Sequence, residues 1–286
     1  MTNIQTAHAQ TKLIVTADDF GADVAVNDAI IRGHRDGILT AASLMVAAPA
    51  AADAVLRAKA YPKLGVGLHL VLVEGRPTLP PKLVPDLVGP DGYFRTDMAW
   101  QGARMFFLPH VRKQLAAEIT AQFEAFAATG LALDHVNAHK HYHLHPTIAA
   151  LTLKIGTSYG LKAMRVPYEP AEVIHRVEPD APHSALVAWY AQKLKRTLAR
   201  DGVRTTDATF GLSWSGAMTT ERVCGLLKAL PPGLNEIYFH PAMVDSYPQS
   251  APGYRYREEA NALTAPEVLA LVRQAGMALG PFAAFG

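Results

Sequence analysis

The sequence predicts a single α/β domain folded as a (β/α) barrel-like structure, that is, a distorted or incomplete TIM-type barrel. Short apolar runs alternate with longer amphipathic helical patterns along the chain, which is typical of a parallel sheet with helical crossovers. This alternation favours a closed or nearly closed barrel over an open sheet, and 286 residues suit a barrel of about 250 residues. No Ser/Gly-rich or Pro/Gly-rich linker divides the chain, so we expect one domain over residues 1–286.

The strands are predicted from apolar runs that end at turn residues or at polar clusters. The first run ends at two aspartates, and the third follows the turn at Gly65. In chain order the expected strands are Lys12–Ala17, Ala42–Val46, Val66–Leu70, Leu133–Asn137, Lys162–Val166, Ala208–Gly211, Glu236–His240 and Ala278–Phe282.

The helices are predicted from amphipathic periodicity and from their start and stop residues. The first ends near Gly37, and the fourth begins at Pro146. In chain order the expected helices are Val24–Arg35, Ala51–Ala60, Val111–Ala128, one after Pro146, Ala185–Arg200, Thr219–Leu230 and Pro266–Ala275.

The stretch from Leu72 to His110 breaks this alternation. It is rich in glycine and proline, so we expect an inserted, lid-like segment over about residues 72–110. It also carries Trp100, Phe106 and Phe107. These side chains predict either ordinary packing over the barrel mouth or an apolar wall for a lipid-linked substrate.

Composition narrows the class of protein. The net charge of +2, without a Lys/Arg block interleaved with aromatics, argues against a nucleic-acid partner. Met1–Gln10 is polar with no signal core, and no run approaches the roughly 18 apolar residues of a membrane span. The single cysteine, Cys224, lies in an amphipathic helical pattern, which favours a small core residue over a reactive thiol. Together these features predict a soluble, cytoplasmic protein.

Two adjacent carboxylates, Asp18 and Asp19, follow the first expected strand directly and precede Gly21. Catalytic groups collect at the C-terminal ends of the strands in a parallel barrel. Neighbouring carboxylates repel each other unless a cation lies between them or each has a separate task. The pair therefore predicts a functional site, the alternative being that one of them caps the next helix.

Histidines follow two further expected strands. His69 ends the third strand, and a cluster follows the fourth. Alternate residues of an extended chain share one face, so the histidines of the cluster cannot all be buried without partners. Imidazole is the commonest metal ligand, and Asp with two His is a familiar open catalytic set. The pattern predicts a metal site, the alternative being a histidine-rich surface loop. The cluster comprises His135, His139, His141, His143 and His145.

Two later strands also end in polar side chains. Arg165 stands in Arg-Val-Pro-Tyr and can hold a carboxylate by a bidentate pair. His240 stands in Phe-His-Pro and can act as an acid near neutral pH. For each residue taken alone, a structural role is the equal alternative.

In this order, the motifs resemble the YdjC/ChbG family of carbohydrate deacetylases, from about Lys12 to Pro241. The resemblance implies a (β/α)-barrel-like fold, N-acetylated sugar substrates and a divalent metal, with Zn²⁺ as the first choice and Mg²⁺ as the alternative. The motifs that carry it are Thr-Ala-Asp-Asp-Phe-Gly at 16–21, Gly-Leu-His-Leu at 67–70, His-x-His-x-His-x-His-Pro at 139–146 and Phe-His-Pro at 239–241.

The resemblance also implies roles for single residues. Asp19, His69 and His139 match the metal ligands of the family, while the roles of His141, His143 and His145 stay open. Asp18 matches the catalytic base. Arg165 is similar to the arginine that orients this base in the related polysaccharide deacetylases, and His240 is similar to their acid histidine.

The histidine-rich segment is most similar to the hopanoid-biosynthesis branch of the family, the HpnK proteins. Asn137-Ala138 stands where many relatives have Asp-Ser or a similar pair. This resemblance implies an N-acetylglucosaminyl hopanoid as substrate. We also expect peripheral contact with a membrane surface, without a transmembrane segment, and a homodimer. The alternatives are a deacetylase of chitooligosaccharides such as diacetylchitobiose, or a non-catalytic sugar- or metal-binding barrel.

Overall fold

The protein is described by a computed structural model that covers residues 11–285. Met1–Gln10, for which we expect no signal core, lies outside the described residues. No helix among the described residues is both long and apolar enough to cross a membrane.

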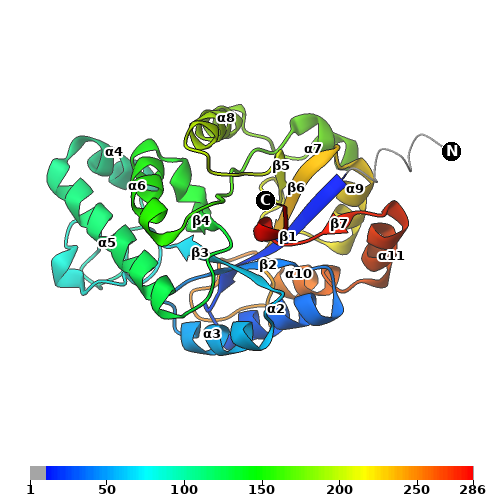
Figure 1. The fold of residues 1–286 in the computed structure, drawn as a ribbon, viewed down its shortest axis with the longest axis horizontal. Coiled ribbons are helices and arrows are strands. Elements are labelled where there is room, and N and C mark those ends of the chain that lie inside the picture. Colours follow the sequence, from blue (N-terminus) through cyan, green and yellow to red (C-terminus); the bar gives the residue numbers. More distant parts are fainter. Residues whose placement is uncertain (1–10, 286) are drawn as a thin grey trace.

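The core of the fold is one curled, wholly parallel sheet, a half-barrel surrounded by helices (Figure 1). Its strands lie in the order β4-β3-β2-β1-β6-β5. Because β6 pairs along one edge of β1, strands β2 and β7 share the other edge. The distorted (β/α) barrel predicted from the sequence is confirmed. The strands are β1 (Thr11–Phe20), β2 (Ala41–Leu44), β3 (Gly65–Leu70), β4 (Val136–Ala138), β5 (Ala208–Phe210), β6 (Gly233–Phe239) and β7 (Ala278–Leu279).

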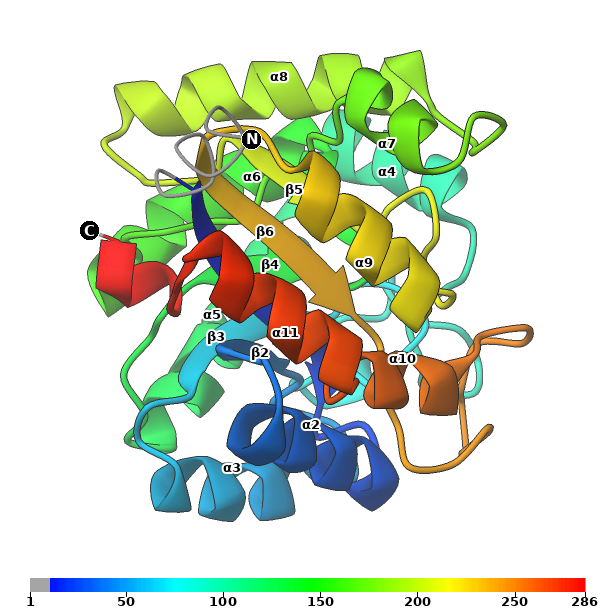
Figure 2. The same ribbon diagram turned by 90° about the vertical axis from the view of Figure 1, so that its right-hand side faces the viewer.

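Helices cover the outside of this sheet (Figures 1 and 2). In Figure 1, α2 and α3 lie below the sheet, α5 and α6 to its left, α9 and α11 to its right, and α8 above it. The helices are α2 (Val24–Asp36), α3 (Ala51–Ala60), α4 (Met98–Phe107), α5 (Pro109–Ala128), α6 (Pro146–Gly156), α7 (Ala171–Val177), α8 (Ala185–Arg200), α9 (Thr220–Ala229), α10 (Tyr256–Ala262) and α11 (Pro266–Ala275).

Two expectations need correction. Lys162–Val166 does not form a strand, because it makes only single parallel bridges, one to β4 and one to the chain at Arg204, and Pro167 then ends the pairing. The segment 72–110 is not wholly irregular, since it contains α4, which Asp97 caps at its N-terminus. Helices α7 and α10, of 7 residues each, were not predicted.

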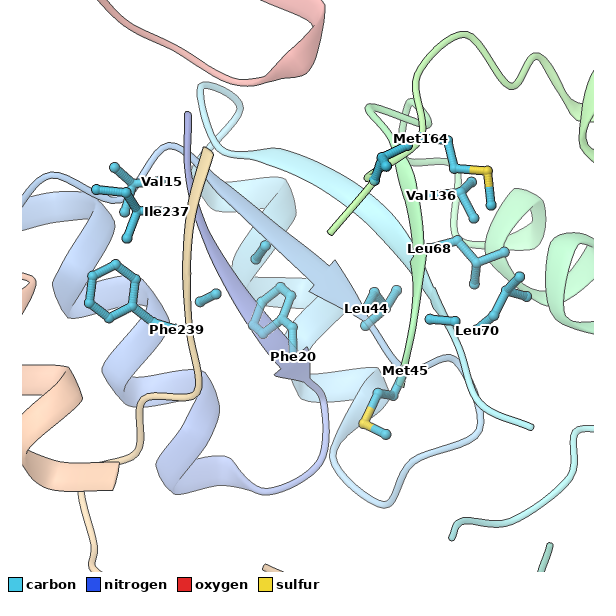
Figure 3. Close-up of a cluster of buried hydrophobic side chains, with 14 of the residues drawn as sticks. Val15, Phe20, Leu44, Met45, Leu68, Leu70, Val136, Met164, Ile237 and Phe239 are labelled. Carbon is cyan, nitrogen blue, oxygen red and sulfur yellow. The ribbon is translucent and has the colours of Figure 1, made fainter. Parts of the chain in front are cut away.

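The apolar core lies between the sheet and its helices, and one of its clusters is shown in Figure 3. Phe20, Leu44 and Leu68 come from neighbouring strands and are fully buried. Burial of such side chains contributes about 1.5–3 kcal/mol each. This packing fixes the positions of the strand ends, from which the polar side chains of the next section project.

Candidate metal centre and active site

The candidate site lies at the C-terminal ends of the parallel strands, in a cavity of about 530 Å³. Asp18 and Asp19 come from the end of β1, and His69 from the end of β3. His139 directly follows β4, and His240 directly follows β6. The structure thus brings together in one cavity five of the six residues predicted from the sequence.

A β-bulge lets two adjacent aspartates reach this cavity. Successive residues of a regular strand point to opposite faces of the sheet. Between Ala17 and Phe20, however, the register of β1 against β2 shifts, and Asp19 takes a left-handed backbone with φ of 63°. Such a conformation costs about 1–3 kcal/mol in a non-glycine residue and tends to occur at functional sites.

Asp19, His69 and His139 form a cluster whose ligand atoms all lie within 4.8 Å of one another. Asp19 Oδ1 is 3.2 Å from His69 Nε2 and 3.2 Å from His139 Nδ1. Burial alone raises the pKa of Asp19, but the neighbouring His139 and His69 outweigh it and hold this pKa well below its usual range. The carboxylate is therefore ionised at neutral pH.

Asn137 fixes which nitrogen of His69 faces the cluster. It is the register partner of His69 across the β3–β4 pair. Because the ionised Asp18 can only accept, the amide nitrogen of Asn137 points to Asp18 Oδ1 at 3.0 Å. Its oxygen then accepts from His69 Nδ1–H at 2.6 Å. The proton of His69 thus sits on Nδ1, and the lone pair of Nε2 is directed towards Asp19.

This arrangement fits a divalent cation. The buried His69 Nε2 has no hydrogen-bond partner, although it lies close to Asp19 Oδ1. A lone pair facing a carboxylate oxygen is unfavourable unless a proton or a metal cation lies between them. Burial lowers the pKa of His69, but the charges of Asp18 and Asp19 outweigh it and raise this pKa, so the site favours a positive charge at this position. One carboxylate and two imidazoles are also a donor set that leaves coordination positions open.

Arg165 lies beneath the cavity and is fully buried between two carboxylates. Its Nη1 donates to Asp18 Oδ2 at 2.5 Å, while Nε and Nη2 donate to Glu236 Oε1 at 2.9 and 2.7 Å. Burial favours a neutral Asp18, but the guanidinium outweighs it and holds the pKa of this carboxyl far below its usual range. Asp18 is therefore an ionised carboxylate held on both oxygens, by Arg165 and by Asn137.

His240 lines the same cavity between Tyr238 and Tyr254, with ring centroids 5.7 and 5.2 Å away. Its backbone N–H donates to the buried Glu259, while its Nδ1 is buried without a partner. Burial lowers the pKa of His240, although the charges of Asp19 and Asp18 oppose the shift.

The histidine cluster does not share one face, which corrects the extended chain assumed above. Residues His139–Leu144 form a 3-10 turn with left-handed backbone at Lys140 and His141. His141 stays in the cavity, where its Nε2 lies 2.9 Å from Tyr238 Oη. His143 turns inward to the carbonyl of Arg165 at 3.0 Å, and burial lowers its pKa to about 3. His145 packs against Phe106 and Tyr142.

A buried chain of hydrogen bonds supports the site from below. Asn137 Nδ2 donates to Ser43 Oγ at 2.9 Å, and Ser43 lies 3.0 Å from His135 Nε2. His135 Nδ1 lies 2.9 Å from Asp134, which also accepts from the backbone N–H of Phe282 at 3.2 Å. The order of donors places the His135 proton on Nδ1. This series of hydrogen bonds connects the backbone at Phe282 to Asn137, the residue that fixes the tautomer of His69.

Several of these residues were not predicted from the sequence. Glu236 was noted only as the first residue of a strand, and Asn137 only as a departure from a motif. The signal for Glu236 was its charge within an apolar strand, because a buried carboxylate needs a partner. Ser43 carried no signal, since its role follows from the β2–β3–β4 register.

A larger open groove of about 1100 Å³ lies elsewhere, along α9. Four of its charged side chains form ion pairs, Arg222 with Glu178 and Arg255 with Glu258. It gathers no cluster of metal-ligating side chains comparable to that of the cavity, so the cavity remains the candidate site.

Comparison with known proteins gives one family. The sequence model of the family described as YdjC-like protein matches residues 12–274. A protein named carbohydrate deacetylase from Geobacillus stearothermophilus is 32% identical over 93% of this chain and 94% of its own length. A mouse protein of the same name is 30% identical over 96% of this chain and 94% of its own length.

Two further proteins match this chain, one over about half of its length and the other over nearly all of it. A carbohydrate deacetylase from Brevibacillus brevis is 40% identical over 157 residues, which span 55% of this chain and 60% of that protein. A crystal structure from Enterococcus faecalis V583, whose suggested role is cellobiose-phosphate cleavage, has a TM-score of 0.76 and 27% identity. It covers 97% of this chain and 99% of its own, so the same fold extends over the whole described chain.

Proposed function

This chain belongs to the YdjC-like protein family, and from that premise we propose that it is a metal-dependent deacetylase of an N-acetylated amino sugar. The observation that carries the proposal is the position of Asp18. An ionised carboxylate, held on both oxygens, lies beside a separate Asp–His–His cluster in the same cavity. Metal binding alone does not require this second carboxylate, whereas hydrolysis requires a base.

The proposed ligands are Asp19, His69 and His139. Their donor set fits Zn²⁺ as the first choice, with Mg²⁺ as the alternative. A divalent cation held there supplies Lewis acidity towards an amide carbonyl and towards water.

Asp18 and His240 are the proposed proton-transfer residues, and Arg165 positions Asp18. Asp18 is the proposed base and accepts a proton from the water that attacks the acetamide carbon. Arg165 keeps this carboxylate ionised and in place. His240 is the proposed acid and protonates the amine nitrogen as the C–N bond breaks, which yields acetate and a free amino sugar. Because burial lowers the pKa of His240, its ring is mostly neutral near pH 7 and must take up a proton before it can protonate the amine.

For the substrate, we propose an N-acetylglucosaminyl lipid of the hopanoid type, with chitooligosaccharides as the alternative. One feature supports the lipid: α4, which lies within the inserted segment, exposes Trp100, Phe106 and Phe107.

The test is acetate release from an N-acetylglucosaminyl hopanoid and from N,N′-diacetylchitobiose, each before and after chelation. Metal-dependent release from the lipid-linked sugar alone supports both the chemistry and the substrate. Release from chitobiose alone retains the chemistry and rejects the lipid. No release from either substrate by protein that holds metal rejects the enzyme in favour of a sugar- or metal-binding barrel.

A further inference from the structure

The outward face of α8 combines exposed apolar and basic side chains. Leu186, Trp189 and Tyr190 are 66%, 57% and 38% exposed, although residues of this size are usually buried. The inward face packs through Ala191, Leu194 and Leu198. The exposed apolar residues are therefore not part of the contact that holds the helix on the protein.

The second half of the same face is basic. Lys193, Arg196 and Arg200 follow Trp189 at the helical spacing that places them on the stripe begun by Leu186 and Trp189. None of the three pairs with a carboxylate among residues 11–285, and the side chain of Lys193 lies over the ring of Trp189 at 5.5 Å. No acidic residue occurs anywhere between Ala185 and Arg200.

The position of α8 leaves this face free. It is the outermost element at the top of both Figure 1 and Figure 2. A groove of about 290 Å³ at its first turn is lined by Ser184, Val187 and Leu212, and Leu212 also lines the active-site cavity. The apolar end of α8 thus lies next to a groove that adjoins the site.

We propose that the outward face of α8 docks this protein onto the surface of an anionic lipid bilayer. Leucine and aromatic side chains enter the boundary between headgroups and acyl chains, while lysine and arginine bind the anionic headgroups. The helix itself carries no acidic residue, although the exposed Glu172 of α7 lines a groove together with Lys193 and Arg196. The excess of basic side chains complements a negative lipid surface, which favours a membrane over a neutral protein partner. This inference does not rest on the proposed function.

The test is co-sedimentation of the full chain with vesicles of phosphatidylcholine, with and without phosphatidylglycerol. The wild type is expected to bind the anionic vesicles and to be released by salt, since screening weakens the attraction. Leu186→Ser/Trp189→Ser and Lys193→Glu/Arg196→Glu are each expected to weaken binding at least about tenfold.

The matched control is Leu56→Ser/Lys59→Glu on α3, which lies at the opposite side of the molecule in both views. Leu56 is 71% exposed, so this variant removes similar side chains from another helix and is expected to bind like the wild type. The proposal is overturned if the folded wild type does not bind vesicles. Dimerisation of two copies through α8 without vesicle binding would be one such result. So does equal binding by the α8 variants. Acetate release from a water-soluble sugar reports on the proposed chemistry separately.

Discussion

At the residue scale, the site depends on side chains that act through others. Asn137 determines which nitrogen of His69 faces Asp19, because its own orientation is set by Asp18. Arg165 holds Asp18 and is itself held by Glu236. That the two aspartates, His69 and the histidine cluster belong to one site could be predicted from the sequence, because each follows a strand. The division into ligands and base came from the family resemblance. The partners of Asn137 and Glu236 could not be predicted, since they come from parts of the chain that are distant in sequence.

Replacement of Asn137 by leucine is expected to weaken metal binding by roughly 10–100-fold, because His69 loses the acceptor that fixes its tautomer. The measurement is competition with a chelator of known affinity. Asn235→Leu is the control: Asn235 is buried and donates only to backbone carbonyls of Pro231 and Gly233. Equal metal affinity of the Asn137 variant and the wild type would contradict the role given to Asn137.

Replacement of Arg165 by methionine is expected to lower the free energy of unfolding by about 3–5 kcal/mol, because two buried carboxylates lose their partner. It should also lower kcat more than it changes KM, since Asp18 is no longer held in place. Urea unfolding and steady-state kinetics measure the two effects. A variant as stable and as active as the wild type would show that the pair has no such role.

At the element scale, helix bounds were predicted most accurately where the helix itself contains the residues that define its periodicity and its ends. The expected bounds of α3, α8 and α11 agree with the structure, because amphipathic periodicity and end residues are local. The segment Lys162–Val166 and the bulge at Asp19 could not be predicted, because both depend on how a neighbouring strand pairs. The insertion over residues 72–110 was predicted as a loop, and its helix α4 was missed.

The inserted segment is tied to α5 by Glu118. This fully buried carboxylate accepts from the backbone N–H groups of Thr78 and Leu79 at 2.8 and 3.1 Å. Glu118→Ala leaves both groups unsatisfied and is expected to lower the free energy of unfolding by about 2–4 kcal/mol. Hydrogen exchange at Thr78 and Leu79 should become faster.

Glu124→Ala is the control for this prediction, because Glu124 is exposed on the same helix and should change stability little. Unchanged exchange in the Glu118 variant would show that the insertion is held by other contacts.

At the scale of the whole molecule, buried ionised carboxylates link stability to pH. Burial alone would raise the pKa of Asp18 and of Asp134, but Arg165 and His135 respectively lower each below its usual value. A carboxyl whose pKa is lower in the folded than in the unfolded chain stabilises the fold above its unfolded pKa. That contribution is lost as the pH falls through the folded pKa.

The free energy of unfolding of the chelated wild type is therefore expected to fall as the pH drops below about 5. In Asp18→Asn the fall should be shallower, because one of the linked groups no longer titrates. Urea titrations between pH 6 and 3 measure both slopes. Identical slopes would contradict the lowered pKa of Asp18.

The most direct test of the proposed chemistry compares two neighbouring substitutions, Asp18→Asn and Asp19→Asn, by metal content and acetate release in the same samples. Asp18→Asn is expected to retain about one metal ion per chain and to lose roughly 10²–10⁴-fold in turnover, as for a general base. Asp19→Asn is expected to lose both metal and turnover, because a ligand is removed. Near-normal turnover by Asp18→Asn, or full metal content in Asp19→Asn, would contradict the assignment of base and ligand.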